Sequence, residues 1–379
     1  MRTKVCEMFG IEFPILAFTH CRDVVAAVGR AGGMGVLGAA GHTAEQLDID
    51  LKWIREELGD RPFGVDLIVP ARYEGKDQGG LSVADLRDRI PEAHKAFVDD
   101  MLRRYDVPPL PDEPDRGRGL SASGGAAPMT HDQAKELMDV AFAYPISLMV
   151  NALGPPPQDM IDRAKEHGVR TAALAGRATH AERHVNMGVD LIVAQGSEAG
   201  GHTGEIGTMV LVPEIVDAVA PVPVLAAGGI GRGRQMAASL ALGAEGVWCG
   251  SVWLTTQEAE THPTVKDKFL AATSADTLRS RSRTGKPARQ LRSAWTDEWD
   301  SEASPGTLGM PLQPMLVAEA TRRIDRAAHD PESGAAKLAN YFVGQIVGNM
   351  NESKPAGRVV IDMVEEFIDA MQRVESMME

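Results

Sequence analysis

A histidine lies inside a glycine-rich segment in the second half of the chain. His202 follows Gly200 and Gly201, and the segment comes directly after an apolar run that ends at Gln195. Glycine lets a backbone pass close to a flat or phosphorylated ligand, and an imidazole exchanges a proton near neutral pH. His202 is therefore the candidate catalytic acid or base, and the alternative is a ring that only hydrogen-bonds its own loop.

Two more apolar runs end in glycine further along the chain. Residues 223–227 lead into Gly228 and Gly229, and residues 246–249 lead into Gly250 and Ser251. The stretch between them, 233–242, carries apolar residues on one helical face and stops before Gly243. This order implies parallel strands followed by loops that bind phosphate through main-chain amides and a helix N-terminus. Simple turns are the alternative interpretation of these glycines.

Eight short apolar runs alternate with helical patterns along most of the chain. Their continuous hydrophobicity is typical of strands that are covered on both faces. The sequence therefore predicts a (β/α)8 TIM barrel, in which the loops after the strands share the face that carries active sites. An open doubly wound sheet is the alternative, but its glycine fingerprint is missing after the first strand. The predicted strands are 14–18, 34–38, 63–69, 146–153, 170–176, 191–195, 222–227 and 246–250, and the predicted helices between them are 23–30, 44–58, 157–167, 180–187, 213–219 and 233–242.

Some segments extend beyond this pattern. Residues 1–255 hold the predicted barrel, with an insertion at 71–135 that contains a helix at 91–104 and a stretch at 107–128 rich in Pro, Gly and Asp. Residues 256–355 are expected to form a helical cap or lid. Residues 356–379 form an amphipathic helix that is expected to pack on the barrel or on a second subunit of a homodimer.

The composition narrows the classes of partner. The chain of 379 residues has 39 Lys and Arg against 53 Asp and Glu, a formal charge of −14, which disfavours nucleic acid and anionic membranes as partners. We find neither a signal-like start nor a run of 18 apolar residues. Three distant cysteines suit a reducing cytoplasm, and the ten histidines show no metal-ligand spacing. We therefore expect a cytoplasmic protein without a metal ion.

Three stretches together resemble the nitronate monooxygenase family, also called 2-nitropropane dioxygenases. They are Gln195–His202, Ala226–Ile230 and Ala241–Ser251, and their order and spacing are specific. The similarity in strand pattern extends over most of residues 10–255. Members of that family are FMN enzymes on a barrel fold, so the resemblance implies FMN as cofactor and the oxidation of a small alkyl nitronate with O2.

The resemblance also implies roles for individual residues. Gly229, Gly250 and Ser251 would hold the flavin phosphate, and Gln195, Ala199 and Gly200 would approach the ring system. His202 matches the catalytic histidine. The complete set assigned to FMN is Ala17, Phe18, Gln195, Ala199, Gly200, Gly201, Ala227, Gly228, Gly229, Gly250 and Ser251.

The first strand departs from the family's usual pattern. The chain has Phe18 there, which could supply an aromatic wall beside the flavin. His20 and His42 follow the first and second strands, so both could face the same mouth as a second acid or as a hydrogen-bond donor to substrate. A capping or surface histidine is the alternative for each of them.

One basic run interrupts this acidic sequence. It is predicted to be a solvated face, and the alternative is a site for the phosphates of a coenzyme A thioester. That alternative matters because the loops also resemble those of flavin-dependent enoyl-thioester reductases, which implies NAD(P)H as electron donor. A barrel that binds a phosphorylated metabolite without redox chemistry is a third hypothesis. The run comprises Arg279, Arg281, Arg283, Lys286, Arg289 and Arg292.

Overall fold

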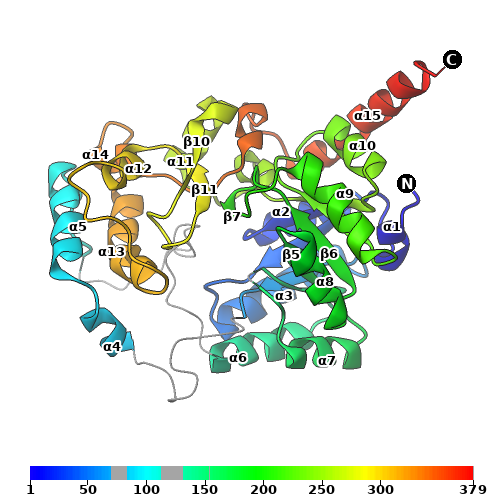
Figure 1. Ribbon diagram of the computed structural model, residues 1–379, viewed down its shortest axis with the longest axis horizontal. Coiled ribbons are helices and arrows are strands. Elements are labelled where there is room, and N and C mark those ends of the chain that lie inside the picture. The colour runs from blue at the N-terminus through cyan, green and yellow to red at the C-terminus, as the bar shows by residue number, and fades with distance from the viewer. Residues whose placement is uncertain (70–82, 112–130, 153, 379) are drawn as a thin grey trace.

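The computed structural model describes residues 1–69, 83–111, 131–152 and 154–378 (Figure 1). Eight parallel strands form a closed barrel in the order β1-β2-β3-β4-β5-β6-β8-β9, which confirms the predicted TIM barrel and its eight strands. The strands are β1 (Ile15–Thr19), β2 (Met34–Gly38), β3 (Gly64–Leu67), β4 (Leu148–Asn151), β5 (Arg170–Ala175), β6 (Leu191–Gln195), β8 (Val224–Ala227) and β9 (Gly246–Cys249).

Helices connect most of these strands on the outside of the barrel. The bounds of α3 could be predicted because both of its ends carry local signals. The Thr43 hydroxyl accepts a hydrogen bond from the Gln46 amide at the start of the helix, and Gly59 follows its last residue. The connecting helices are α2 (Arg22–Arg30), α3 (Ala44–Leu58), α6 (His131–Phe142), α7 (Gln158–Glu166), α8 (Ala178–Asn186), α9 (Thr208–Val219) and α10 (Gly233–Ala241).

Helix α9 begins earlier than the sequence predicted. The predicted helix starts at Pro213, a residue that favours a first helical turn, but the structure starts at Thr208. The Glu198 carboxylate accepts hydrogen bonds from the Thr208 amide at 3.0 Å and from its hydroxyl at 2.9 Å. This acceptor lies ten residues upstream, outside any local capping pattern, so the sequence does not reveal the true start.

Alternate strand residues fill the barrel interior. Leu16, Met34 and Val150 belong to one buried cluster inside the strands, whereas Ala17 belongs to the larger cluster shared with the surrounding helices. Helix α1 (Lys4–Phe9) adds Phe9 to the interior cluster, so it covers the end of the barrel at which the strands begin. The opposite end, where the strands finish, is therefore the end whose loops can form an active site.

Two excursions from the barrel pack together as one cap, seen at the left of Figure 1. Helices α4 (Val83–Asp88) and α5 (Glu92–Arg104), from the insertion after β3, contact α13 (Leu312–Ala327), which follows β9. The Phe97 and Trp299 rings lie 5.0 Å apart, and both terminal nitrogens of Arg104 bond Glu298 at 2.7 Å. Residues 112–130 of the same insertion lie outside the described ranges.

The segment after β9 contains strands as well as the predicted helices. Strands β10 (Thr277–Ser280) and β11 (Ala288–Leu291) form an antiparallel sheet with β7 (Gly201–His202). These short strands show no apolar alternation, and β7 lies far from them in the sequence, so they could not be predicted from the sequence. The helices of this segment are η3 (Ser251–Thr255), α11 (Pro263–Ala271), η4 (Ser274–Asp276), α12 (Ala294–Trp299), α13, α14 (Gly334–Leu338) and η5 (Gln345–Asn349).

The last helix, α15 (Ala356–Glu375), packs against α10 and α2 through its first half. Val360 and Met363 are buried there, whereas Ile368 and Met371 near the other end are about half exposed. Figure 1 shows the last turns extending beyond the barrel. Within the ranges that the structure describes, no helix has the length and apolarity that crossing a membrane requires.

Candidate active site

The glycine-rich loops after β6, β8 and β9 emerge at the same end of the barrel. Ser251 accepts a hydrogen bond from the Gly344 amide at 2.8 Å. Gly200 packs against the backbone of Val343 and Gly344, because an added Cβ would lie 2.9 Å from the Gly344 nitrogen. A cap segment that the sequence analysis did not single out, residues 343–345, therefore joins the loops after β6 and β9.

His202 is held from two sides by cap residues. Its Nε2 atom lies 2.8 Å from the hydroxyl oxygen of Thr284, and its backbone pairs with Ala288 of β11. The Phe342 ring lies 6.3 Å from the imidazole, centroid to centroid. The antiparallel sheet thus fixes the histidine at the mouth of the barrel, and neither Thr284 nor Phe342 carried a sequence signal.

The surroundings of His202 keep its ring neutral. Burial, and to a smaller extent the nearby positive charge of Lys286, together lower the pKa of the imidazole to about 4. The Lys286 side chain is exposed, whereas His202 is half-buried. At neutral pH the site therefore pairs an uncharged proton acceptor with an ammonium group that attracts anions.

A second group of rings lies at the same mouth, on β1 and β9. The Phe18 ring stacks on Trp248 with centroids 6.0 Å apart, and the His20 ring meets Phe18 edge-on at 5.2 Å. The Nδ1 of His20 donates a hydrogen bond to the Gly38 carbonyl at 2.7 Å, which leaves Nε2 as the free acceptor. Burial lowers the pKa of His20, and the neighbouring His42 lowers it further.

His42 is bound to the scaffold. Its Nε2 lies 3.1 Å from the Asp50 carboxylate on α3, and Arg22 bonds the same carboxylate at 3.1 Å. These contacts favour the structural interpretation of His42 over a role as substrate donor. Among the described residues, neither His20 nor His42 makes a hydrogen bond or a ring contact with His202.

Asp66 is a titratable group that the sequence analysis missed. It lies on β3, 2% exposed, and its Oδ1 has no hydrogen-bond partner among the described residues. Its neighbours Val65 and Leu67 pack outward against the helices, so the Asp66 side chain points into the barrel. Burial raises its pKa to about 8, so the carboxyl is protonated at neutral pH. The sequence does single out this residue, because Asp66 is the only carboxylate in the eight predicted strands.

The remaining predicted cofactor residues differ in where their side chains point and in which of their polar groups are already hydrogen-bonded. Ala227 lines the interior at the end of β8, whereas the Ala17 side chain points away from it. Gln195 ends β6, and its side chain makes no hydrogen bond with the described residues, whereas the Ala199 amide donates to the Gly196 carbonyl at 3.2 Å. Gln195 and Ala227 are therefore better placed for a ligand than the Ala17 side chain.

Two of the predicted glycines show why only glycine fits. Gly228 has a φ of +106°, and an added Cβ would lie 2.7 Å from the Thr208 hydroxyl, so this position is explained by packing. Gly201 has a φ of +76° with nothing within 4 Å of the added Cβ. Open space at Gly201, one residue before His202, leaves room for a ligand.

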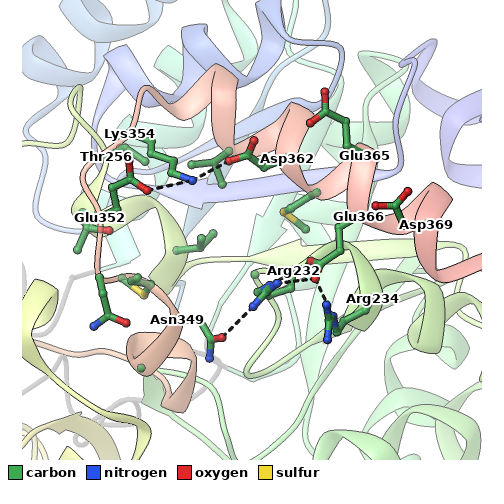
Figure 2. Close-up of a pocket in the computed structure, with 18 residues that line it drawn as sticks. Arg232, Arg234, Thr256, Asn349, Glu352, Lys354, Asp362, Glu365, Glu366 and Asp369 are labelled. Atoms are coloured by element: carbon green, nitrogen blue, oxygen red, sulfur yellow. Dashed lines mark hydrogen bonds and ion pairs between the residues drawn. The ribbon is translucent and has the colours of Figure 1, made fainter.

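The N-terminus of α10 already holds a carboxylate from the protein itself. Glu366 of α15 accepts hydrogen bonds from the Gly233 amide at 2.9 Å and from Arg232 and Arg234 at 2.6 Å, as Figure 2 shows for the side chains. A phosphate therefore has only the loop amides, not this helix end. The surface cavity of about 780 Å³ beside these residues is lined by none of the predicted site residues.

The basic run forms the solvated face that the sequence predicted only in part. Arg281, Lys286 and Arg292 are exposed, whereas the other three arginines bond to the protein. Arg283 is 5% exposed and bonds Asn340, Arg279 donates to the Thr203 carbonyl at 3.1 Å, and Arg289 donates to the Ser197 carbonyl at 3.0 Å. The physical reason is the unpredicted sheet, which lays Arg279 and Arg289 over the His202 loop, whose carbonyls accept their hydrogen bonds. Because Arg279, Arg283 and Arg289 already bond groups of the protein, they are less available for the phosphates of a coenzyme A thioester.

Among the described residues, one group has the composition of a metal site. Cys21, Asp23 and Glu260 bring one ligand atom each within 4.8 Å of one another, a grouping that sequence spacing did not predict. The Cys21 thiol donates to the Glu258 carbonyl at 3.0 Å, and burial raises its pKa to about 11. A protonated thiol with this bond acts as a buried hydrogen-bond donor.

Comparison with known proteins gives a consistent result. The family model described as nitronate monooxygenase matches residues 2–366. A Mycobacterium tuberculosis protein named "Putative monooxygenase Rv1533" is 59% identical over the full length of both chains. A Staphylococcus aureus protein named "Probable nitronate monooxygenase" is 28% identical over 98% of this chain and 99% of its own. The solved structure of nitroalkane oxidase from Streptomyces ansochromogenes superposes with a TM-score of 0.77, at 27% identity over 98% of this chain and 99% of its own.

Proposed function

The chain belongs to the nitronate monooxygenase family, and from this premise we propose that it is an FMN-dependent oxidoreductase that converts alkyl nitronates with O2. Membership makes it a flavin-dependent oxidoreductase of nitronates in general terms. The choice of FMN, the use of O2 and the catalytic role of His202 are the parts that we propose.

Several features of the mouth suit a flavin. The amides of Gly229, Gly250 and Ser251 would hold its phosphate, as main-chain NH groups do in other barrels. Phe18 offers an aromatic surface at the same mouth, packed against Trp248. When bound, the flavin supplies the electron acceptor for the oxidation.

The Asp66 carboxyl, whose Oδ1 has no hydrogen-bond partner among the described residues, is a further contact for the cofactor or substrate. In its protonated form it carries one hydrogen-bond donor and retains an acceptor. An unpaired polar group inside a barrel is costly, and a ligand at the mouth would remove that cost. Asp66 is the only carboxylate that the eight barrel strands contain.

One observation carries the proposal: a neutral, half-buried imidazole lies beside an ammonium group where the glycine-rich loops meet. His202 would accept the proton from the carbon next to the nitro group of a nitroalkane. Lys286 would then attract the negatively charged nitronate oxygens by its charge. A substrate supplied as nitronate has already lost this proton, so it needs only the attraction by Lys286.

Oxygen uptake tests this function directly. Protein purified without added cofactor should be yellow, and it should consume O2 with an alkyl nitronate in the absence of pyridine nucleotide. A thioester reductase would instead have its flavin reduced by NADH or NADPH and would ignore the nitronate. A colourless protein that binds no FMN would refute both enzyme hypotheses and leave the non-redox barrel.

A further inference from the structure

The hydroxyl of Thr284 is within hydrogen-bonding distance of three groups. It donates to the Lys286 carbonyl at 3.1 Å, it lies 3.4 Å from the Lys286 amide, and it lies 2.8 Å from Nε2 of His202. A threonine hydroxyl has one hydrogen and two lone pairs. A carbonyl oxygen can only accept, so the bond to Lys286 uses that single hydrogen.

The remaining contacts must then be donated to Thr284. Nε2 of His202 therefore carries the ring proton, and Nδ1 keeps the lone pair. Among the described residues none hydrogen-bonds Nδ1 of His202, and Nδ1 is not one of the fully buried polar atoms without a partner. We infer that Thr284 is a positioning residue that fixes the tautomer of His202, so that Nδ1 is the atom that takes the substrate proton.

The turn that carries Thr284 is itself held rigidly. Arg283 beside it bonds Asn340 through Nε at 2.9 Å, and the Ser282 carbonyl accepts from Gln313 at 2.7 Å. Gly285 on the other side lies against the backbone of Leu308, because an added Cβ would be 2.4 Å from that carbonyl oxygen. The hydroxyl is thus placed by the cap, and a fixed partner orients a catalytic histidine more effectively than a mobile one.

The proton transfer that follows is balanced. The Nδ1 lone pair forms an N–H bond, the C–H bond next to the nitro group breaks, and its electron pair stays on the resulting nitronate anion. His202 becomes an imidazolium that donates through both nitrogens, with Nε2 still bonded to Thr284. This step depends on the proposed function, but the assignment of the tautomer does not.

Two substitutions of Thr284 distinguish a role in orienting the His202 ring from a role in folding alone. Thr284→Val keeps the shape of the side chain and removes the hydroxyl, and Thr284→Ser retains the hydroxyl. Nitrogen-15 NMR of histidine-labelled, flavin-loaded protein reports which ring nitrogen carries the proton. We expect the Nε2–H form in the native protein and in Thr284→Ser, and a mixture of both tautomers in Thr284→Val.

Kinetics supply the second measurement. Losing one oriented hydrogen bond should lower kcat for a nitroalkane by about tenfold in Thr284→Val, with KM nearly unchanged, and Thr284→Ser should restore most of it. The inference is overturned if the native protein shows the Nδ1–H form, or if Thr284→Val keeps a pure Nε2–H ring. Absence of nitronate turnover combined with the expected spectra would refute the proposed function and leave the tautomer assignment standing.

Discussion

The hydroxyl oxygen of Thr284 and Nε2 of His202 lie 2.8 Å apart although 82 positions separate them in the chain. The contact joins the cap to the loop after β6, and β11 pairs with the same loop beside it. The cap therefore does more than cover the barrel mouth, because it supplies the partner that orients the candidate base.

Replacement of His202 tests its chemical role. His202→Ala should retain bound flavin, because the proposed phosphate contacts come from other loops, while turnover of a nitroalkane falls by roughly two to four orders of magnitude. Absorbance of the purified protein and oxygen uptake measure the two effects. His180→Ala, on the exposed surface of α8, is the matched control and should behave as the native protein. Unchanged turnover in His202→Ala would remove the residue from the mechanism.

The pH dependence of nitroalkane turnover should reveal the environment of His202. Because burial and the Lys286 charge lower its pKa to about 4, the ring stays neutral and able to accept a proton down to that pH. We expect kcat/KM, which reports the free enzyme, to stay flat from pH 8 to about pH 5 and to fall only as pH approaches 4. A profile that already loses half its value near the ordinary histidine pKa of about 6.5 would contradict this environment.

Asp66 should make the stability of the protein depend on pH. Its folded-state pKa of about 8 lies above the unfolded value of 3.8, so the folded state holds this proton more tightly. The stabilising contribution is therefore complete below pH 4 and is lost as pH rises through 8, at roughly 1.4 kcal/mol per pH unit within that window. Asp66→Asn does not titrate, so its melting temperature should rise relative to the native protein between pH 5 and pH 8. A constant difference across this range would show that Asp66 is ionised throughout.

The phosphate site is tested by adding a negative charge to it. Gly229→Asp places a carboxylate where loop amides would meet the cofactor phosphate, so the protein should be purified without its flavin. Gly229 has a φ of +68°, so backbone strain needs its own control. Gly59→Asp introduces the same residue at a φ of +60° with open space around it. Flavin retained in Gly229→Asp, or lost equally in Gly59→Asp, would dismiss the assignment of this loop.

Much of the barrel was predictable from the sequence because its signals are local. Most of the strands are continuous apolar runs, and α3 has a cap residue at one end and a glycine at the other. The same reasoning singled out His202 as a candidate, since a histidine among glycines after a buried strand is recognisable in the sequence alone. Helix α9 shows the limit, because the carboxylate of Glu198 that caps it lies outside the helix.

The rest of the site depends on contacts between distant segments. Strands β10 and β11 become strands by pairing with each other and with the His202 loop, and their arginines are engaged for the same reason. Thr284 carries no signal of its own, since its role exists only once the cap has folded against the loop. Asp66 could have been found, because a carboxylate inside an apolar strand needs an explanation.

Anaerobic mixing of the yellow protein with an alkyl nitronate, without NADH or NADPH, tests the central claim most directly. The visible absorbance of the flavin should be lost on mixing and should return when O2 is admitted. If the absorbance persists with the nitronate but disappears on addition of NADH, the protein is not an oxidase of nitronates, and its substrate lies elsewhere.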